Sequence, residues 1–251
     1  MTHCNTPGSE KKPSLGTLLT AAADRIPAVL SALLQGKPKL VLAACLFLTC
    51  ACAASGPVCP EPEDSQTVCC PEQWNESGAG YTLRHAGTLA FPGEKIPVEG
   101  IMRLDLKEKK ARISVWTMFG AELFTLTVSE DQTEADYIQS GLKSVPGFAS
   151  KAGRSIRRSF FAPNKDPDCY RQGNRTVGCL RTDQTAVEYT FSPEGLLLQK
   201  APPGPSPEWS VAFKQYVAYA GEDIPEHVEY TADDFRVSLK LKEVKRLCPA
   251  K

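Results

Sequence analysis

The chain has 251 residues, with 29 basic and 29 acidic side chains and a formal net charge of zero at pH 7. This balance argues against a nucleic-acid-binding protein, because such proteins usually show a clear basic excess. Ten cysteines are unusual for a cytosolic protein and favour an oxidising compartment outside the cytoplasm.

Residues 1–36 form a segment that fits no clear structural class. Asp24, Arg25 and Pro27 interrupt its apolar residues, which argues against a membrane-spanning helix. We interpret residues 1–36 as an uncertain N-terminal extension or a mis-assigned start and leave them out of the fold prediction.

Residues 37–52 are typical of a bacterial lipoprotein signal. Two lysines precede an apolar run from Leu40 to Cys52, and small residues follow. This order defines a secretion signal, and the run is shorter than the roughly 20 apolar residues of a spanning helix.

We predict Cys52 as the lipid-modified cysteine. Cys45 is the alternative, because Leu-Ala-Ala-Cys at 42–45 matches a lipobox better but lies closer to the lysines. An unprocessed membrane anchor is the other interpretation of this run.

The signal predicts a location in the bacterial cell envelope, with a lipid anchor at the N-terminus. Ala53 follows Cys52 at the position where lipoproteins retained in the inner membrane carry Asp. This favours the outer membrane, with the protein facing the periplasm.

Residues 53–73 are rich in proline, acidic and small residues and show no periodicity. This composition predicts an extended, flexible tether, so the folded domain is expected to span 74–251. No helix or strand is predicted before Trp74.

The cysteines of the exported part predict disulfides. Cys169 and Cys179 flank a segment with two glycines and an asparagine, which favours a local bond between them. Closing so short a loop would stabilise the fold by about 3 kcal/mol on the chain-entropy model. Cys248 is a candidate partner for Cys69 or Cys70, although connectivity does not follow from sequence.

Alternation of apolar and polar residues predicts the strands of an antiparallel sheet. The first four form a meander joined by short turns, and their expected ranges are 81–91, 98–106, 111–119 and 122–129. Residues 131–144 are polar and carry no expected strand. The later strands are expected at 186–191, 195–199, 208–220, 224–230 and 235–244.

Residues 145–161 switch to helical spacing and predict one amphipathic helix. Its apolar face holds Val145, Phe148, Ala149, Ala152, Ile156 and Phe160, and its opposite face is basic. Such a helix can lie on a membrane. We favour packing on the sheet, because a helix between two groups of strands usually covers a sheet face. The predicted fold class is mainly β (α+β): a curled antiparallel sheet or unclosed β-barrel, with the inserted helix covering its concave face.

The sequence shows no catalytic constellation. It has no nucleophile elbow, glycine-rich phosphate loop or HExxH motif. His85 lies on the inward face of an expected strand and is predicted to be a hydrogen-bonded core histidine. Cys69-Cys70 is not a CxxC pair, and no histidine lies at ligand spacing from a cysteine. We therefore predict no enzyme activity, no metal site and no cofactor.

Three parts of the domain resemble the LolA/LolB-like outer-membrane lipoprotein family. Residues 85–91 and 98–106 (HAGTLAF and VEGIMRLDL) resemble its opening hairpin, and residues 111–126 (ARISVWTMFGAELFTL) resemble the following strand pair. Residues 224–230 and 235–245 resemble its closing section. The resemblance implies an unclosed barrel with an apolar cavity for acyl chains, in a membrane-anchored lipoprotein that handles lipids or lipoproteins at the outer membrane.

The inward faces of the expected elements supply the candidate cavity-lining residues. These are Leu83, Leu89, Met102, Leu104, Ile113, Val115, Phe124, Leu126, Phe148, Ile156, Phe160, Phe213 and Leu239. Each CH₂ of an acyl chain that they buried would contribute about 0.8 kcal/mol. The same residues equally suit a filled core. The alternative is therefore a non-catalytic scaffold or accessory lipoprotein that binds an envelope protein partner.

Overall fold

The computed structural model describes residues 66–182, 185–232 and 234–247. Over these residues the fold is mainly β, as predicted. Twelve strands form one antiparallel sheet that stays open: β1 (Gly80–Phe91), β2 (Glu94–Asp105), β3 (Lys110–Thr117), β4 (Glu122–Val128), β5 (Thr133–Ile138), β6 (Asp168–Gln172), β7 (Arg175–Arg181), β8 (Ala186–Phe191), β9 (Leu197–Ala201), β10 (Trp209–Tyr219), β11 (Glu222–Ala232) and β12 (Phe235–Leu247). The helices are η3 (Trp74–Glu76), α4 (Ser140–Lys143) and α5 (Phe148–Phe160).

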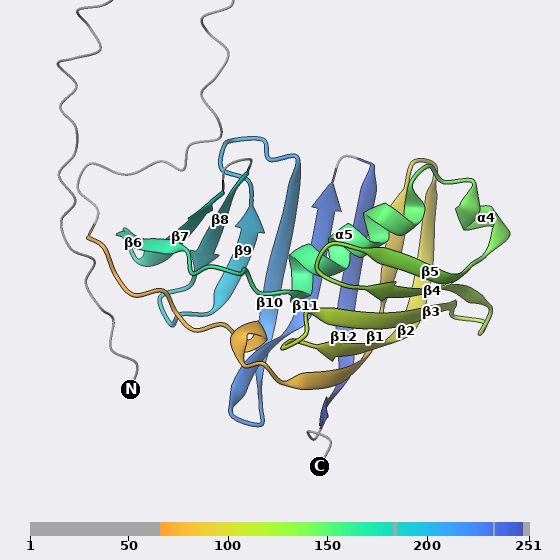
Figure 1. Ribbon diagram of the computed structural model, residues 1–251, viewed down its shortest axis with the longest axis horizontal. Coiled ribbons are helices and arrows are strands. Elements are labelled where there is room, and N and C mark those ends of the chain that lie inside the picture. The colour runs from red at the N-terminus through yellow and green to blue at the C-terminus, as the bar shows by residue number, and fades with distance from the viewer. Residues whose placement is uncertain (1–65, 183–184, 233, 248–251) are drawn as a thin grey trace, which may run out of the picture. The chain divides into compact units, whose positions relative to one another are not determined.

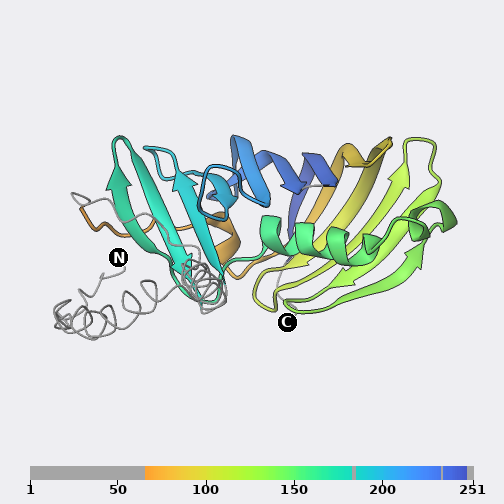
Figure 2. The ribbon, with the colours of Figure 1, turned by 90° about the horizontal axis from the view of Figure 1, so that it is seen from above.

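The two edge strands of the sheet are consecutive in the chain. The strand order is β5-β4-β3-β2-β1-β12-β11-β10-β9-β8-β7-β6, so β1 and β12 pair in the middle and the edges are β5 and β6. The connection between the edges contains α4 and α5 (Figure 1). Seen from above, α5 runs along the hollow side of the curled sheet (Figure 2). The predicted covering of the concave face by an inserted helix is thus confirmed.

Helix α5 packs on the sheet through its apolar side. It begins after Gly147, whose φ of 67° suits glycine, and it buries Phe148, Ala152, Ile156 and Phe160. Gly153 is also buried and faces Thr133 of β5, with no room for a Cβ atom. On the outer side, Lys151 forms an ion pair with Asp234. The structure therefore supports the packed interpretation of this helix.

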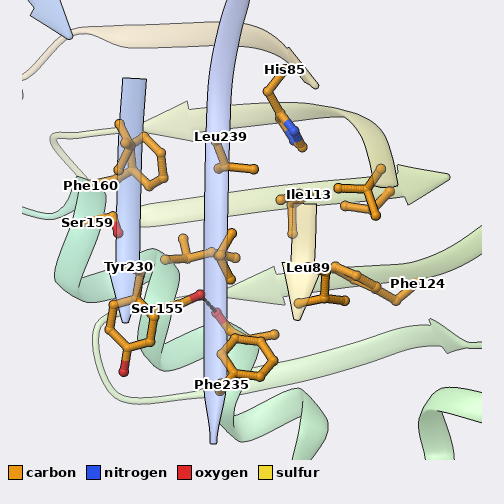
Figure 3. Close-up of a pocket in the computed structure, with 16 residues that line it drawn as sticks. His85, Leu89, Ile113, Phe124, Ser155, Ser159, Phe160, Tyr230, Phe235 and Leu239 are labelled. Carbon is orange, nitrogen blue, oxygen red and sulfur yellow. Dashed lines mark hydrogen bonds between the residues drawn. The ribbon is translucent and has the colours of Figure 1, made fainter. Parts of the chain in front are cut away.

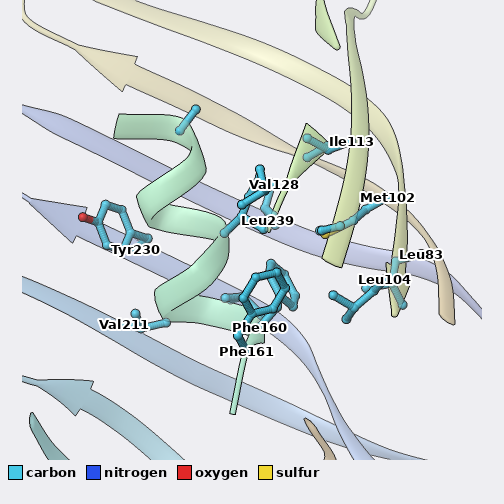
Figure 4. Close-up of a cluster of buried hydrophobic side chains, with 14 of the residues drawn as sticks. Leu83, Met102, Leu104, Ile113, Val128, Phe160, Phe161, Val211, Tyr230 and Leu239 are labelled. Carbon is cyan, nitrogen blue, oxygen red and sulfur yellow. The ribbon is translucent and has the colours of Figure 1, made fainter. Parts of the chain in front are cut away.

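The core lies between α5 and the concave face of the sheet (Figure 4). Strands β1, β2 and β4 contribute fully buried side chains to this core: Leu83, Met102, Leu104 and Leu126. Phe160 of α5 packs edge-to-face on Trp74 of η3. Burying each such side chain contributes about 1.5–3 kcal/mol, so this apolar layer holds the helix against the sheet.

The sequence prediction missed three strands. The edge strand β5 is exposed along its centre, so it shows none of the alternation that a half-buried strand carries. Strands β6 and β7 form a tight hairpin through Gly173, whose φ is 62°. The prediction interpreted these residues as a disulfide-closed turn.

The predicted Cys169–Cys179 disulfide is wrong, because Cys169 is bonded to Cys70, 99 residues earlier in the chain. The pleat explains why the local bond does not form. Cys169 pairs with Gly178 across the hairpin, so the next residue, Cys179, points to the opposite face. Cys69 and Cys179 each take part in a disulfide as well. Cys248 lies outside the described residues.

Residues 66–73, the end of the segment expected to be a tether, pack on the sheet. The backbone N–H of Val68 donates to Cys169 (3.1 Å), and that of Arg171 donates to Gln66 (3.1 Å). Together with the disulfide, these bonds cover the free edge of β6, which would otherwise expose unpaired backbone groups. Ordered packing therefore begins before Trp74.

The predicted signal and anchor, residues 37–52 with Cys45 and Cys52, lie outside the described residues. Within the described ranges, every helix is too short or too polar to cross a membrane.

Candidate binding site on the concave face

The space beneath α5 is almost completely filled. A cavity of about 40 Å³ remains between the helix and the sheet (Figure 3). A water molecule occupies about 30 Å³ in the liquid, so this cavity holds roughly one water and no acyl chain. The predicted residues that line it are Leu89, Ile113, Val115, Phe124, Ile156, Phe160 and Leu239.

The other predicted cavity residues lie elsewhere in the same core. Leu83, Met102, Leu104, Leu126, Phe148 and Phe213 are each at most 3% exposed and do not line the small cavity. With α5 docked, these side chains contact one another across a closed interior. An acyl chain at this position requires α5 to move away.

His85 is one of the polar residues that line the small cavity, together with Ser155, Ser159 and Tyr230 (Figure 3). His85 is buried as predicted, but neither ring nitrogen has a hydrogen-bond partner among the described residues. Burial lowers the pKa of this imidazole to about 4, so it is neutral at pH 7. Gly100 on β2 makes room for the ring, since a Cβ there would lie 2.5 Å from His85 Cε1.

A much larger groove opens beyond the end of α5. Its volume is about 830 Å³. One wall is the last turn of α5 and residues 161–165, and the other is formed by β7, β8, β9 and the loop before β10. Aliphatic and aromatic side chains, including Leu180, Val187 and Trp209, alternate here with basic ones.

The groove and the small cavity lie on one continuous face of the sheet. Cross-strand partners share a face, and Lys200 of β9 pairs with Tyr189 on one side and with Val211 on the other. Val211 pairs with Tyr230, which pairs with Val237. The row therefore leads from the floor of the groove to the residues beneath α5.

Lys200 is a buried cation in the wall of this groove. The residue is 2% exposed, and its Nζ lies 5.7 Å and 5.5 Å from the ring centres of Tyr189 and Phe213. Its hydrogen bond is a long one, 3.5 Å to the backbone oxygen of Phe161. Burial lowers the pKa of Lys200 to about 8, an effect that the charge of Glu76 opposes.

Arg158 lines the groove beside Tyr230, which lines the small cavity. Its guanidinium stacks on Trp209, 4.1 Å from the ring centre, and donates to the hydroxyl of Tyr230 (2.9 Å). Burial lowers the pKa of Arg158, and the nearby Tyr230 and Glu208 oppose this. The preceding residue in the groove wall, Arg157, donates to the backbone oxygens of Ser129 and Gln132 at 3.2 Å and 2.9 Å.

The sequence prediction did not find this groove. Its walls come from residues that are far apart in the chain, and one of the strands that line it, β7, was not predicted. Lys200 at the end of a strand carries no sequence signal of burial. Trp209, Arg158 and the proline-rich loop 201–207 were visible in the sequence, but their meeting depends on the crossover of α5.

A second exposed feature lies at the β3–β4 turn. Phe119 is 98% exposed and Met118 is 66% exposed, which makes them the most exposed large apolar side chains among the described residues. The turn is closed by a hydrogen bond from Gly120 N–H to Thr117 (2.9 Å). Phe119 was part of a predicted strand, and the structure places it beyond the end of β3.

The fold resembles that of several solved structures. One is a putative outer membrane lipoprotein-sorting protein domain from Vibrio parahaemolyticus, at 10% identity and a TM-score of 0.42, covering 70% of this chain and 88% of that one. Another is a LolA superfamily protein from Nitrosomonas europaea, at 9% identity and a TM-score of 0.40, covering 69% and 89%. A DUF1329 family protein from Desulfovibrio piger has 6% identity and a TM-score of 0.41, covering 70% and 89%.

No protein-family model matches the sequence, and no curated protein matches it. At identities of 10% or less and TM-scores near 0.4, the solved structures leave function to be argued from this chain's own side chains.

Proposed function

We propose that this protein is a non-catalytic lipoprotein of the bacterial cell envelope that binds acyl chains of lipids or lipoproteins. The observation that carries the proposal is the groove of about 830 Å³ on the part of the concave face that α5 leaves uncovered. In this proposal a lipid at Cys52, or at Cys45, anchors the chain to the outer membrane, and the folded domain faces the periplasm.

The size and lining of the groove suit an acyl chain. Small-molecule sites are typically concave spaces of roughly 300–1,000 Å³ with mainly apolar walls and a few polar groups. Leu180 and Val187 are cross-strand partners, half-buried, and both line the groove. An acyl chain against this wall gains about 0.8 kcal/mol per buried CH₂ without any movement of α5.

The β3–β4 turn supports a role at a lipid surface. Aromatic side chains with large exposed area enter the interfacial region of a bilayer favourably. Phe119 is exposed over 98% of its surface and makes no contribution to the core. In this proposal the turn touches the membrane from which an acyl chain is taken or to which it is delivered.

Photochemical labelling in intact membranes tests the proposal. Bacteria that produce the full chain are grown with a diazirine fatty acid and then illuminated. The labelled peptides of the protein are mapped by mass spectrometry. We expect labelling within residues 161–165 and 180–189. The substitution Val187→Asp is expected to reduce this labelling several-fold, because it places a charge against the acyl chain. Thr190→Asp, on the opposite face of β8, serves as the matched control.

Labelling confined to the N-terminal region and the β3–β4 turn would contradict acyl binding in the groove. That outcome would favour the second candidate, a scaffold or accessory lipoprotein that binds an envelope protein. The observation in its favour is the filled interior beneath α5, where about 40 Å³ remains open.

A further inference from the structure

We propose that the groove recognises the anionic headgroup, a phosphate or a carboxylate, of the amphiphile that it binds. This inference rests on the proposed function and adds the class of lipid. The groove combines apolar walls with a concentration of positive charge, and its basic residues include one whose side chain is buried in the wall.

The described lining of the groove is basic. Six basic side chains and two carboxylates line it: Lys109, Arg157, Arg158, Lys165, Arg181 and Lys200, with Glu130 and Glu208. Glu130 forms an ion pair with Lys109 at 3.6 Å, so these two charges offset each other. The excess of positive charge within a walled space raises the local concentration of anions.

Lys200 forms no ion pair with a described carboxylate, although the charge of Glu76 acts on it from a greater distance. A buried ammonium that is not paired is costly, and a single long bond to a carbonyl oxygen offsets little of that cost. An anion in the groove would supply the missing charge at the floor, where Tyr189 and Phe213 already hold the Lys200 side chain.

Arg158 is oriented for the same ligand. Stacking on Trp209 and the bond to Tyr230 hold the guanidinium in one plane, and no described carboxylate pairs with it. A guanidinium has five N–H donors and binds carboxylate or phosphate through two parallel hydrogen bonds. In this inference the acyl part of the ligand packs near the Trp209 indole, and Arg158 donates hydrogen bonds to the headgroup.

Native mass spectrometry of the full chain in a non-ionic detergent tests this inference. Dioleoyl phosphatidylglycerol and dioleoylglycerol carry the same acyl chains, and only the first has a phosphate, so a difference in affinity reports on the phosphate headgroup. We expect phosphatidylglycerol to bind about tenfold more tightly, as expected for charge-assisted hydrogen bonds. Lys200→Met and Arg158→Gln are each expected to lower phosphatidylglycerol affinity about fivefold and to change dioleoylglycerol affinity much less. Arg175→Gln, an exposed change on β7 outside the groove, is the control.

The outcomes separate the two proposals. Equal binding of both lipids would overturn the headgroup inference and leave acyl binding intact. Binding of neither lipid by the folded wild-type chain would overturn the proposed function itself. Water-soluble sn-glycerol 3-phosphate is the third probe. If it binds as tightly as phosphatidylglycerol, the groove is a site for a soluble phosphate and the lipid-headgroup inference is wrong. The wild-type comparison decides the question even if a variant fails to fold.

Discussion

The ammonium nitrogen of Lys200 lies 5.5 Å from the centre of the Phe213 ring, on the concave face of the sheet. Tyr189 flanks the same nitrogen at 5.7 Å. Two aromatic faces thus stabilise a cation that no described carboxylate pairs with, since rings attract cations through their quadrupoles. A cation buried between aromatic rings without an ion pair reduces stability, and we attribute its presence to ligand binding.

The burial of Lys200 predicts a pH dependence of stability. The pKa of Lys200 falls from 10.5 to about 8 on folding, so above pH 8 the unfolded chain binds more protons and stability rises with pH. We expect a gain of roughly 1–2 kcal/mol between about pH 8 and 9.5. Above about pH 10 a second group lowers stability as pH rises. Burial and a bond to Glu222 raise the pKa of Tyr81 from 10.0 to about 12, so the folded chain keeps a proton that the unfolded chain loses.

Thermal unfolding of the full chain at several pH values measures this effect. Lys200→Met is expected to raise Tm at pH 7 and to remove most of the rise above pH 8. Lys242→Met, an exposed change on β12, is expected to keep the wild-type profile. A lower Tm for Lys200→Met at pH 7 would show that the buried cation stabilises the fold.

Gly153→Ala tests the packing of α5 on β5. Replacing glycine by alanine within a helix usually stabilises by about 1 kcal/mol. Here the new Cβ would lie 2.7 Å from Thr133 Cγ2 and closer still to its Oγ1, so we expect a loss of roughly 1–2 kcal/mol instead. Denaturant unfolding measures the change.

Two further variants define the cause of that loss. Gly141→Ala in α4 meets no atom within 4 Å and is expected to be neutral or stabilising. Adding Thr133→Ala to Gly153→Ala is expected to restore part of the lost stability, because it removes Oγ1 and Cγ2 but leaves the Thr133 Cβ, 2.8 Å from the new Cβ. If the double variant remains as unstable as Gly153→Ala alone, the contact between α5 and β5 is not the cause.

The Cys70–Cys169 bond is expected to be a major source of stability. It closes a loop of 99 residues and fixes residues 66–70 against the edge of β6. Cys70→Ala with Cys169→Ala is expected to destabilise by about 5 kcal/mol on the chain-entropy model. Non-reducing peptide mapping should recover a peptide pair that links these two cysteines, and a pair linking Cys169 to Cys179 would contradict the structure.

The substitution Phe119→Ser tests whether this side chain contacts the membrane, without a change in the stability of the fold. Because Phe119 is 98% exposed, the substitution is expected to change the free energy of unfolding by less than about 0.5 kcal/mol. It is expected to weaken photolabelling of the β3–β4 turn by the diazirine lipid. Arg112→Ser, on the exposed side of β3, is the control for a surface change remote from the turn. Undiminished labelling of the turn in Phe119→Ser would exclude this residue from membrane contact.

The sequence alone determined the elements whose two faces differ in polarity. The first four strands, the strands from β8 to β12 and helix α5 were predicted from apolar spacing, because one face of each packs into the core. From these elements the open, mainly β sheet with an inserted helix also followed. Strand β5 has both faces mostly exposed at the edge, and the β6–β7 hairpin is dominated by its cysteines and glycines, so neither shows that pattern.

Only the tertiary structure decided what the concave face contains. Whether inward-facing Leu, Val and Phe side chains surround a cavity or fill a core depends on how closely α5 approaches the sheet, and apolar spacing is the same in both cases. The partner of Cys169 depends on the pleat of β6 and on the path of residues 66–70. The groove at Lys200, Arg158 and Trp209 exists because the chain crosses from one edge of the sheet to the other. Such long-range contacts are set by packing in three dimensions, which local periodicity does not encode.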